Sequence, residues 1–119
     1  MAALFGLFGC SSSEPDVDAV RPALKAAVLA VPGVTGGTVG FTVAALSPRA
    51  TCEVTGEGTT TAELSETLER VLKVVTDHIR PYRVGNATCS ISNGGVIVRQ
   101  TDLGFTSPAS FDDLRARFP

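Results

Sequence analysis

The chain has 119 residues, of which 44% are hydrophobic and 18% are charged, and its formal net charge is −2. This length and composition indicate one globular domain rather than a disordered chain, and such a domain buries roughly 60 to 65% of its unfolded surface. The low net charge, with no run of more than two like charges, excludes the basic surface that nucleic-acid binding needs, so no nucleic-acid partner is expected.

The N-terminal segment is apolar or small up to Cys10, and three serines follow it. The run Leu-Phe-Gly-Cys-Ser over residues 7–11 resembles the lipobox of bacterial lipoproteins, in which the cysteine is diacylated and becomes the mature N-terminus. Two features depart from that pattern. Phe8 stands where a smaller residue is usual, and the apolar stretch is short and lacks a basic start.

The resemblance implies three segments. Residues 1–9 would be a signal-peptide-like segment, residues 10–15 the lipidated cysteine with its tether, and residues 16–119 a single domain. The protein would then be anchored on the extracytoplasmic face of the bacterial cell membrane, since two acyl chains give stable attachment. The alternative is an ordinary apolar N-terminus in which Cys10 is an unmodified thiol.

The amino-acid usage resembles that of proteins from high-GC bacteria such as actinobacteria and their phages, because arginine outnumbers lysine eight to two and alanine, valine, glycine and threonine are abundant. This resemblance concerns composition alone.

A first helix is indicated between Asp16 and Val31, where apolar and small residues recur at helical spacing before Pro32. Pro22 is tolerated in a first turn but not in mid-helix. We therefore expect either a start near Asp18 or a bend at the proline.

The clearest pattern runs from Thr60 to Pro81 and predicts the central amphipathic helix. Thr60 and Glu63 form a capping-box pair at its start, and Arg80 with Pro81 marks its end. Its apolar stripe consists of Leu64, Leu68, Val71, Leu72, Val75 and Ile79.

Two stretches of alternating residues predict β-hairpins. The first follows the first helix and turns at Ser47 and Pro48, and the second follows the central helix and turns at residues 93–95. The order helix, hairpin, helix, hairpin predicts an α+β two-layer sandwich of αββαββ type, a circular permutation of the ferredoxin-like order, with both helices on one face of a four-stranded sheet.

A short third helix is expected over the last residues, with Ser107 and Pro108 at its N-cap and first position. Phe105, Phe111 and Phe118 gather in this region. They either seal the sheet of their own domain or form an apolar surface for a partner.

Cys52 and Cys89 are a candidate disulfide. A lipidated Cys10 would leave them as an even pair in an oxidising compartment, where a bridge is favoured. Two considerations oppose this: both lie at core-facing strand positions, and the ferredoxin-like order places one strand between them, too far for a bond.

No catalytic or metal site is indicated. His78 is the only histidine, the cysteines lack zinc-site spacing, and no acid and base converge, so we expect neither an enzyme nor a bound cofactor or metal.

The leading hypothesis is therefore a membrane-anchored cell-envelope lipoprotein that binds an unidentified envelope protein, with phage-encoded superinfection exclusion as a narrower version. The alternative is a soluble domain with unmodified Cys10 that binds a small ligand or dimerises through its sheet.

Overall fold

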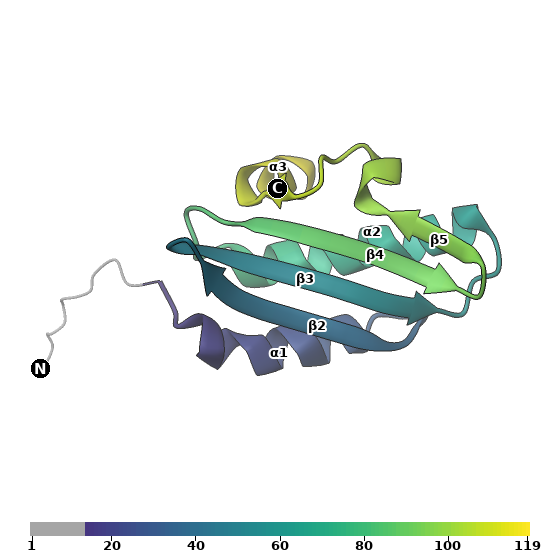
Figure 1. The fold of residues 1–119 in the computed structure, drawn as a ribbon, viewed down its shortest axis with the longest axis horizontal. Coiled ribbons are helices and arrows are strands. Elements are labelled where there is room, and N and C mark those ends of the chain that lie inside the picture. The colour runs from purple at the N-terminus through teal and green to yellow at the C-terminus, as the bar shows by residue number, and fades with distance from the viewer. Residues whose placement is uncertain (1–13) are drawn as a thin grey trace, which may run out of the picture.

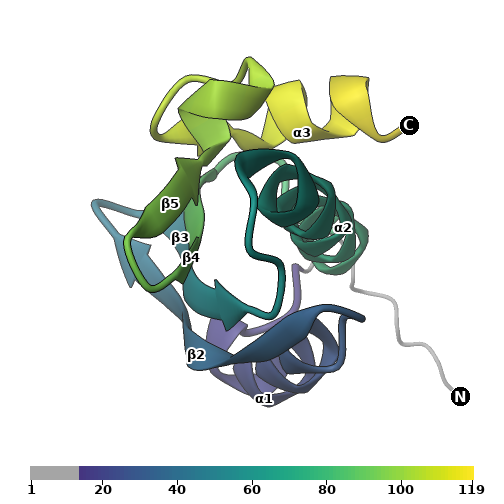
Figure 2. The same cartoon turned by 90° about the vertical axis from the view of Figure 1, so that its right-hand side faces the viewer.

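The protein is an α+β sandwich, seen here in a computed structural model that describes residues 14–119. Five strands form one mixed sheet, and α1 and α2 pack against one of its faces, as the sequence predicted (Figures 1 and 2). The elements in chain order are α1 (Val17–Leu29), β2 (Val34–Ala44), β3 (Ser47–Gly56), α2 (Thr61–Ile79), β4 (Asn86–Asn93), β5 (Val96–Arg99), a 3₁₀ turn (Gln100–Leu103), β6 (Ala109–Ser110) and α3 (Phe111–Arg117).

The strand order differs from the predicted ferredoxin-like permutation. The order is β2-β3-β4-β5, with β3 and β4 parallel and directly paired, and β6 adds a short antiparallel pairing to β4. The expectation that one strand separates β3 from β4 was therefore wrong. The eight-residue β4 takes the inner position and the four-residue β5 the edge, which suits a strand with more main-chain groups to pair.

Helix α2 begins as predicted. The Thr60 side chain accepts a hydrogen bond from the Glu63 main-chain N–H at 3.1 Å, and the Glu63 carboxylate accepts from the N–H groups of Thr59 and Thr60. These bonds lower the pKa of Glu63, with the Thr59 N–H as the largest cause. The predicted stripe is fully buried against the sheet.

Helix α1 starts earlier than expected. Asp16 is the N-cap and accepts from the Asp18 N–H at 3.0 Å, so of the two alternatives the start near Asp18, which would have placed Pro22 in the first turn, was wrong. Pro22 lies inside the helix on its exposed side. Arg21 donates to the Phe41 main-chain oxygen at 2.8 Å and so ties α1 to β2, along which the helix runs at the margin of the sheet (Figure 1).

The first hairpin turns one step before the predicted site. Ala45 and Leu46 form the turn with φ of 52° and 69°, and Ser47 and Pro48 already belong to β3. Left-handed backbone favours glycine or asparagine, and a residue such as leucine costs of order 1 to 3 kcal/mol there.

Helix α3 also begins later than predicted, with Ser110 rather than Ser107 as its N-cap. It docks through Phe111, whose ring would lie 2.3 Å from a Cβ at Gly85. Gly85 has a φ of 149° as well, so this position requires glycine on two counts.

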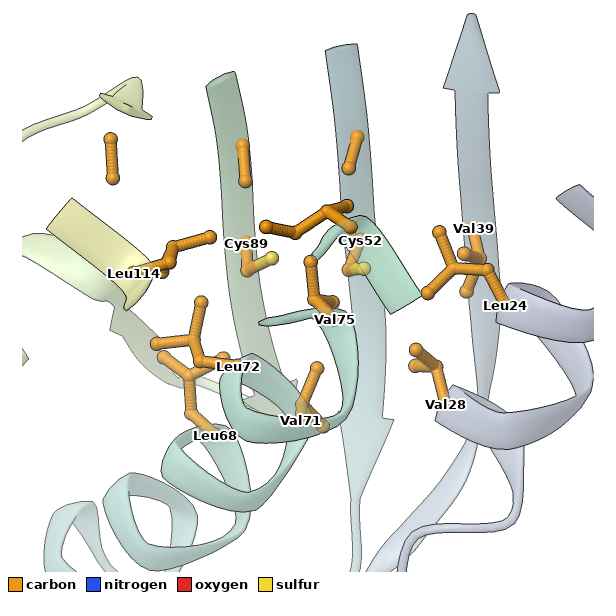
Figure 3. Close-up of a cluster of buried hydrophobic side chains, with 14 of the residues drawn as sticks. Leu24, Val28, Val39, Cys52, Leu68, Val71, Leu72, Val75, Cys89 and Leu114 are labelled. Atoms are coloured by element: carbon orange, nitrogen blue, oxygen red, sulfur yellow. The ribbon is translucent and has the colours of Figure 1, made fainter. Parts of the chain in front are cut away.

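The core lies between the sheet and the helices and includes residues from all three helices. Leu24 and Val28 of α1 pack beside Val39, and Leu114 of α3 lies near the stripe of α2 (Figure 3).

Candidate functional site

One face of the sheet is not covered by any helix of the described residues, and Figure 1 views it directly, with α2 behind the strands. In β3, buried residues alternate strictly with exposed ones, so every second side chain points away from the helices. The residues on this face are mostly hydroxyl-bearing: Thr38, Thr42, Arg49, Thr51, Glu53, Thr55, Thr88, Ser90, Ser92, Ile97 and Arg99.

Strand register arranges these side chains in rows across the sheet. One row runs through Thr38, Glu53, Ser90 and Arg99, and the next contains Gly40, Thr51 and Thr88. Opposite charges therefore stand at two positions of one row, separated by a serine. Most of the other side chains on this face are small, so main-chain and hydroxyl groups of the sheet lie close to its surface.

The outward-pointing side chains of this face are mainly hydrogen-bonding groups. Glu53 is the single carboxylate among the outward-pointing residues of the paired strands, and no histidine, cysteine or lysine accompanies it there. Hydroxyl groups donate and accept hydrogen bonds, but without a nearby base they are weak nucleophiles.

Cys52 and Cys89 lie on the opposite, buried face. They are directly paired positions of β3 and β4, both thiols are free, and they are 0% and 1% exposed. The Cys89 sulfur is turned towards Cys52 (Figure 3). A hydrogen bond with Cys52 and burial together raise the pKa of the Cys89 thiol well above its usual range, so it is protonated and a poor nucleophile.

The separation of the two cysteines does not exclude a disulfide. Neighbouring strands lie about 4.8 Å apart, inside the range of about 4.4 to 6.8 Å between Cα atoms that a disulfide spans. The predicted strand between the two cysteines, which would have kept them too far apart for a bond, is absent, since β3 and β4 pair directly. A disulfide between Cys52 and Cys89 stays a prediction.

His78 has a structural environment. Its Nδ1 lies 3.0 Å from the Val74 main-chain oxygen one turn earlier in α2, and the ring is half-buried. Asp77 next to it pairs with Arg80 at 3.2 Å and Lys73 at 3.8 Å. Within residues 14–119, no group of three or more His, Cys, Asp or Glu side chains is placed to hold a metal ion.

The C-terminal phenylalanines pack within their own domain. Phe111 is fully buried, Phe105 is 9% exposed, and Phe118 is half-buried and stacks on Phe105 at 6.3 Å. Arg117 lies 5.2 Å from the centre of the Phe105 ring. Of the two predicted roles, the structure shows the one in which these residues seal the domain rather than form an open partner surface.

At the N-terminus of α2, the Glu63 carboxylate accepts from the N–H groups of Thr59 and Thr60 and places a negative charge there, which disfavours a bound anion. Cys10 and the preceding residues lie outside the described part of the chain. In that part, no helix has the length and apolar character to cross a membrane.

Sequence reasoning missed Gln100, the most buried amide in the core at 1% exposure. Its Oε1 accepts from the Cys89 N–H at 2.7 Å, and its Nε2 donates to the oxygens of Ala87 at 2.9 Å and Thr106 at 2.7 Å. The side chain thus fills the interval on β4 between the pairings of β5 and β6. No local sequence pattern predicts this buried amide, because glutamine at a strand end usually faces solvent.

No protein-family model, curated protein or solved structure matches this chain.

Proposed function

We propose that this protein is a lipid-anchored, non-enzymatic component of the bacterial cell envelope whose domain binds another protein through the uncovered face of the sheet. The anchor is proposed from the lipobox-like residues around Cys10. The binding role is proposed from the residues on the uncovered face of the sheet.

The observation behind the binding role is a sheet face several strands wide that the described part of the domain leaves uncovered (Figure 1). Its hydroxyl groups offer many weak hydrogen bonds, and Glu53 and Arg99 add one negative and one positive position at defined places in a row. Charges arranged in this way fix the register of a partner and disfavour wrong partners more than they add affinity.

The anchor is tested in protein made by its own host. Intact mass should show loss of residues 1–9 and gain of a diacylglyceryl group on Cys10. Cys10→Ser should move the protein from the membrane to the soluble fraction, whereas Ser12→Ala, two residues further on, should leave it in the membrane. An unmodified thiol with residues 1–9 still attached would refute the anchor.

The binding face is tested by site-specific photo-crosslinking in cells. A crosslinker at Thr51, near the middle of the face, should give one defined adduct, and a crosslinker at Lys73 on the outside of α2 should not. Glu53→Arg should remove the Thr51 adduct. Equal adducts from both positions, or none from Thr51, would argue against the face as a binding surface.

The same experiment distinguishes the alternative. A Thr51 adduct of twice the chain mass, together with an unmodified Cys10, would favour a soluble domain that dimerises through its sheet. The narrower role in superinfection exclusion needs a separate test. Expression of the lipidated chain should reduce phage infection of its host, and expression of the Cys10→Ser chain should not.

A further inference from the structure

One end of the molecule brings together three segments that are distant in sequence. The Arg83 N–H donates to the Glu14 carboxylate at 2.7 Å, and the Tyr82 hydroxyl donates to the Pro15 oxygen at 2.7 Å. The start of the described chain therefore lies on the loop between α2 and β4. Because β3 and β4 are parallel, with Arg49 opposite Asn86, the β2–β3 turn lies at this same end (Figure 1).

This end carries most of the exposed large hydrophobic side chains of residues 14–119. Val43 is 56% exposed, Leu46 96% and Val84 57%; the fourth such residue, Ile97, lies on the sheet face. Val84 lies two residues before Asn86, the β4 residue opposite Arg49 of β3. The loop that carries Val84 is therefore at the same end as the β2–β3 turn, and we call Val43, Leu46 and Val84 the end surface.

Leu46 is not explained by the fold. It stands in a left-handed turn that favours glycine or asparagine, and its side chain is almost fully exposed, so it contributes no packing within the domain. Because Leu46 gains no packing from its own domain, an apolar environment supplied from outside would stabilise it there.

The length of the tether identifies that environment, if Cys10 is the anchor of the proposed function. Glu14 is four residues after Cys10, and an extended chain spans at most about 3.6 Å per residue, so Glu14 lies within about 14 Å of the acylated residue. The end surface is therefore the part of the domain held nearest to the bilayer.

The charges at this end fit a phospholipid surface. Arg49 is exposed, and neither its side chain nor that of Arg83 forms an ion pair within the described residues. Arginine places its charge at lipid phosphates while its stem lies along apolar groups. The carboxylates of Glu14 and Asp16 at the same end accept main-chain N–H groups and keep their negative charge, which the guanidinium groups of Arg49 and Arg83 balance.

We propose that Val43, Leu46 and Val84, with Arg49 and Arg83, form a membrane-docking end that rests on the phospholipid surface. The strands then stand away from the bilayer, and the uncovered sheet face is open to the side. This inference rests on the proposed function, because the anchor at Cys10 brings this end to the membrane.

The test measures which end meets the bilayer without relying on natural lipidation. The full chain with Cys10→Ser and an N-terminal hexahistidine is bound to phosphatidylglycerol vesicles that contain a nickel-chelating lipid. A small thiol-reactive fluorophore is placed at Ala45→Cys, or at Gly95→Cys in the turn at the opposite end, where an added Cβ meets nothing within 4 Å. The buried Cys52 and Cys89 leave the new thiol as the reactive one.

Spin-labelled lipids should quench the fluorophore at position 45 several-fold more than at position 95. Leu46→Asn in the position-45 chain should lower the quenching to the level seen at position 95, while its urea midpoint stays equal or rises because asparagine suits the left-handed turn. Ile97→Asn, which removes the exposed hydrophobic residue of the sheet face, should leave the quenching unchanged.

Equal quenching at both positions, no quenching at position 45, or no effect of Leu46→Asn would each overturn the docking end. These outcomes are distinct from failure of the anchor, which the mass of the native chain reports. An unmodified Cys10 together with selective quenching at position 45 would refute the lipoprotein and keep the docking end.

Discussion

At the scale of single residues, Gln100 shows how one side chain completes a sheet. Its amide bonds the Cys89 N–H and the Ala87 oxygen of β4, between the pairing with β5, which starts at Ser90, and the pairing with β6, which ends at Ala87. A buried main-chain group without a partner costs about 1 to 3 kcal/mol.

We expect Gln100→Met to destabilise the fold by about 3 kcal/mol, because methionine has a similar length but leaves the Cys89 N–H and the Ala87 oxygen unpaired. Urea unfolding measures the change. The exposed neighbour Thr101 provides the control, and Thr101→Ala should stay within about 0.5 kcal/mol of the parent. A loss below 1 kcal/mol for Gln100→Met would mean that water or a shifted strand replaces the amide.

Tyr82 gives a pH-dependent expectation. Burial, followed by the charges of Glu14 and Asp16, raises the pKa of its hydroxyl. Because the folded-state pKa lies above the unfolded value, the contribution of this group to stability is complete below about pH 10 and is lost as the pH rises through the folded-state pKa.

Tyr82→Phe should cost about 1 kcal/mol at neutral pH, since it removes the hydrogen bond to Pro15. The advantage of the parent over the variant should then shrink above about pH 10. Paired urea titrations at neutral and alkaline pH measure it, and a difference that stays constant through that range would contradict the assigned shift.

At the scale of elements, sequence patterns predicted what neighbours in the chain decide. The capping box at Thr60 and the turn after Asn93 depend on residues a few positions apart, and both are present. The order of β4 and β5 depends on which strand pairs with β3 across the length of α2, and both orders bury the same alternating residues. Periodicity alone therefore could not choose between them.

The paired cysteines of β3 and β4 should behave differently before and after folding. In the folded chain, the buried Cys52 and Cys89 thiols should resist glutathione disulfide. The same oxidant present during refolding should join them, since the strands bring them together before the core excludes the reagent and each exchange step releases a glutathione thiol. Alkylation under denaturing conditions, followed by mass measurement, counts the remaining thiols. Rapid oxidation of the folded protein would show that the core opens locally.

At the scale of the whole molecule, α1, α2 and α3 share one core cluster with the sheet. The described domain should therefore unfold in one cooperative step. Tyr82 is the only tyrosine and there is no tryptophan, so intrinsic fluorescence reports the junction of the loop after α2 with Phe41, whose ring lies 5.3 Å away. Fluorescence and circular dichroism should give coincident urea curves, and separated midpoints would show that part of the domain unfolds independently.

The candidate surfaces were only partly predictable at this scale. The alternation of Thr51 and Glu53 with buried residues identified outward positions, and the placement of both helices on one side identified the open face. The sequence did not identify Leu46 as a turn residue, because Ser47 and Pro48 next to it have the stronger turn preference. The phenylalanines drew attention as large apolar residues, but only the packing of Phe111 on Gly85 shows that they are enclosed.

The bond from Arg21 to the Phe41 oxygen has a consequence for crowding. An unguarded outer strand can recruit the equivalent strand of a neighbour and grow into an aggregate. Here α1 lies beside β2 and a guanidinium already engages one of its carbonyl groups, so stacking of copies through this margin is opposed. At high local concentration, copies of the chain are then hindered from joining their sheets edge to edge through β2.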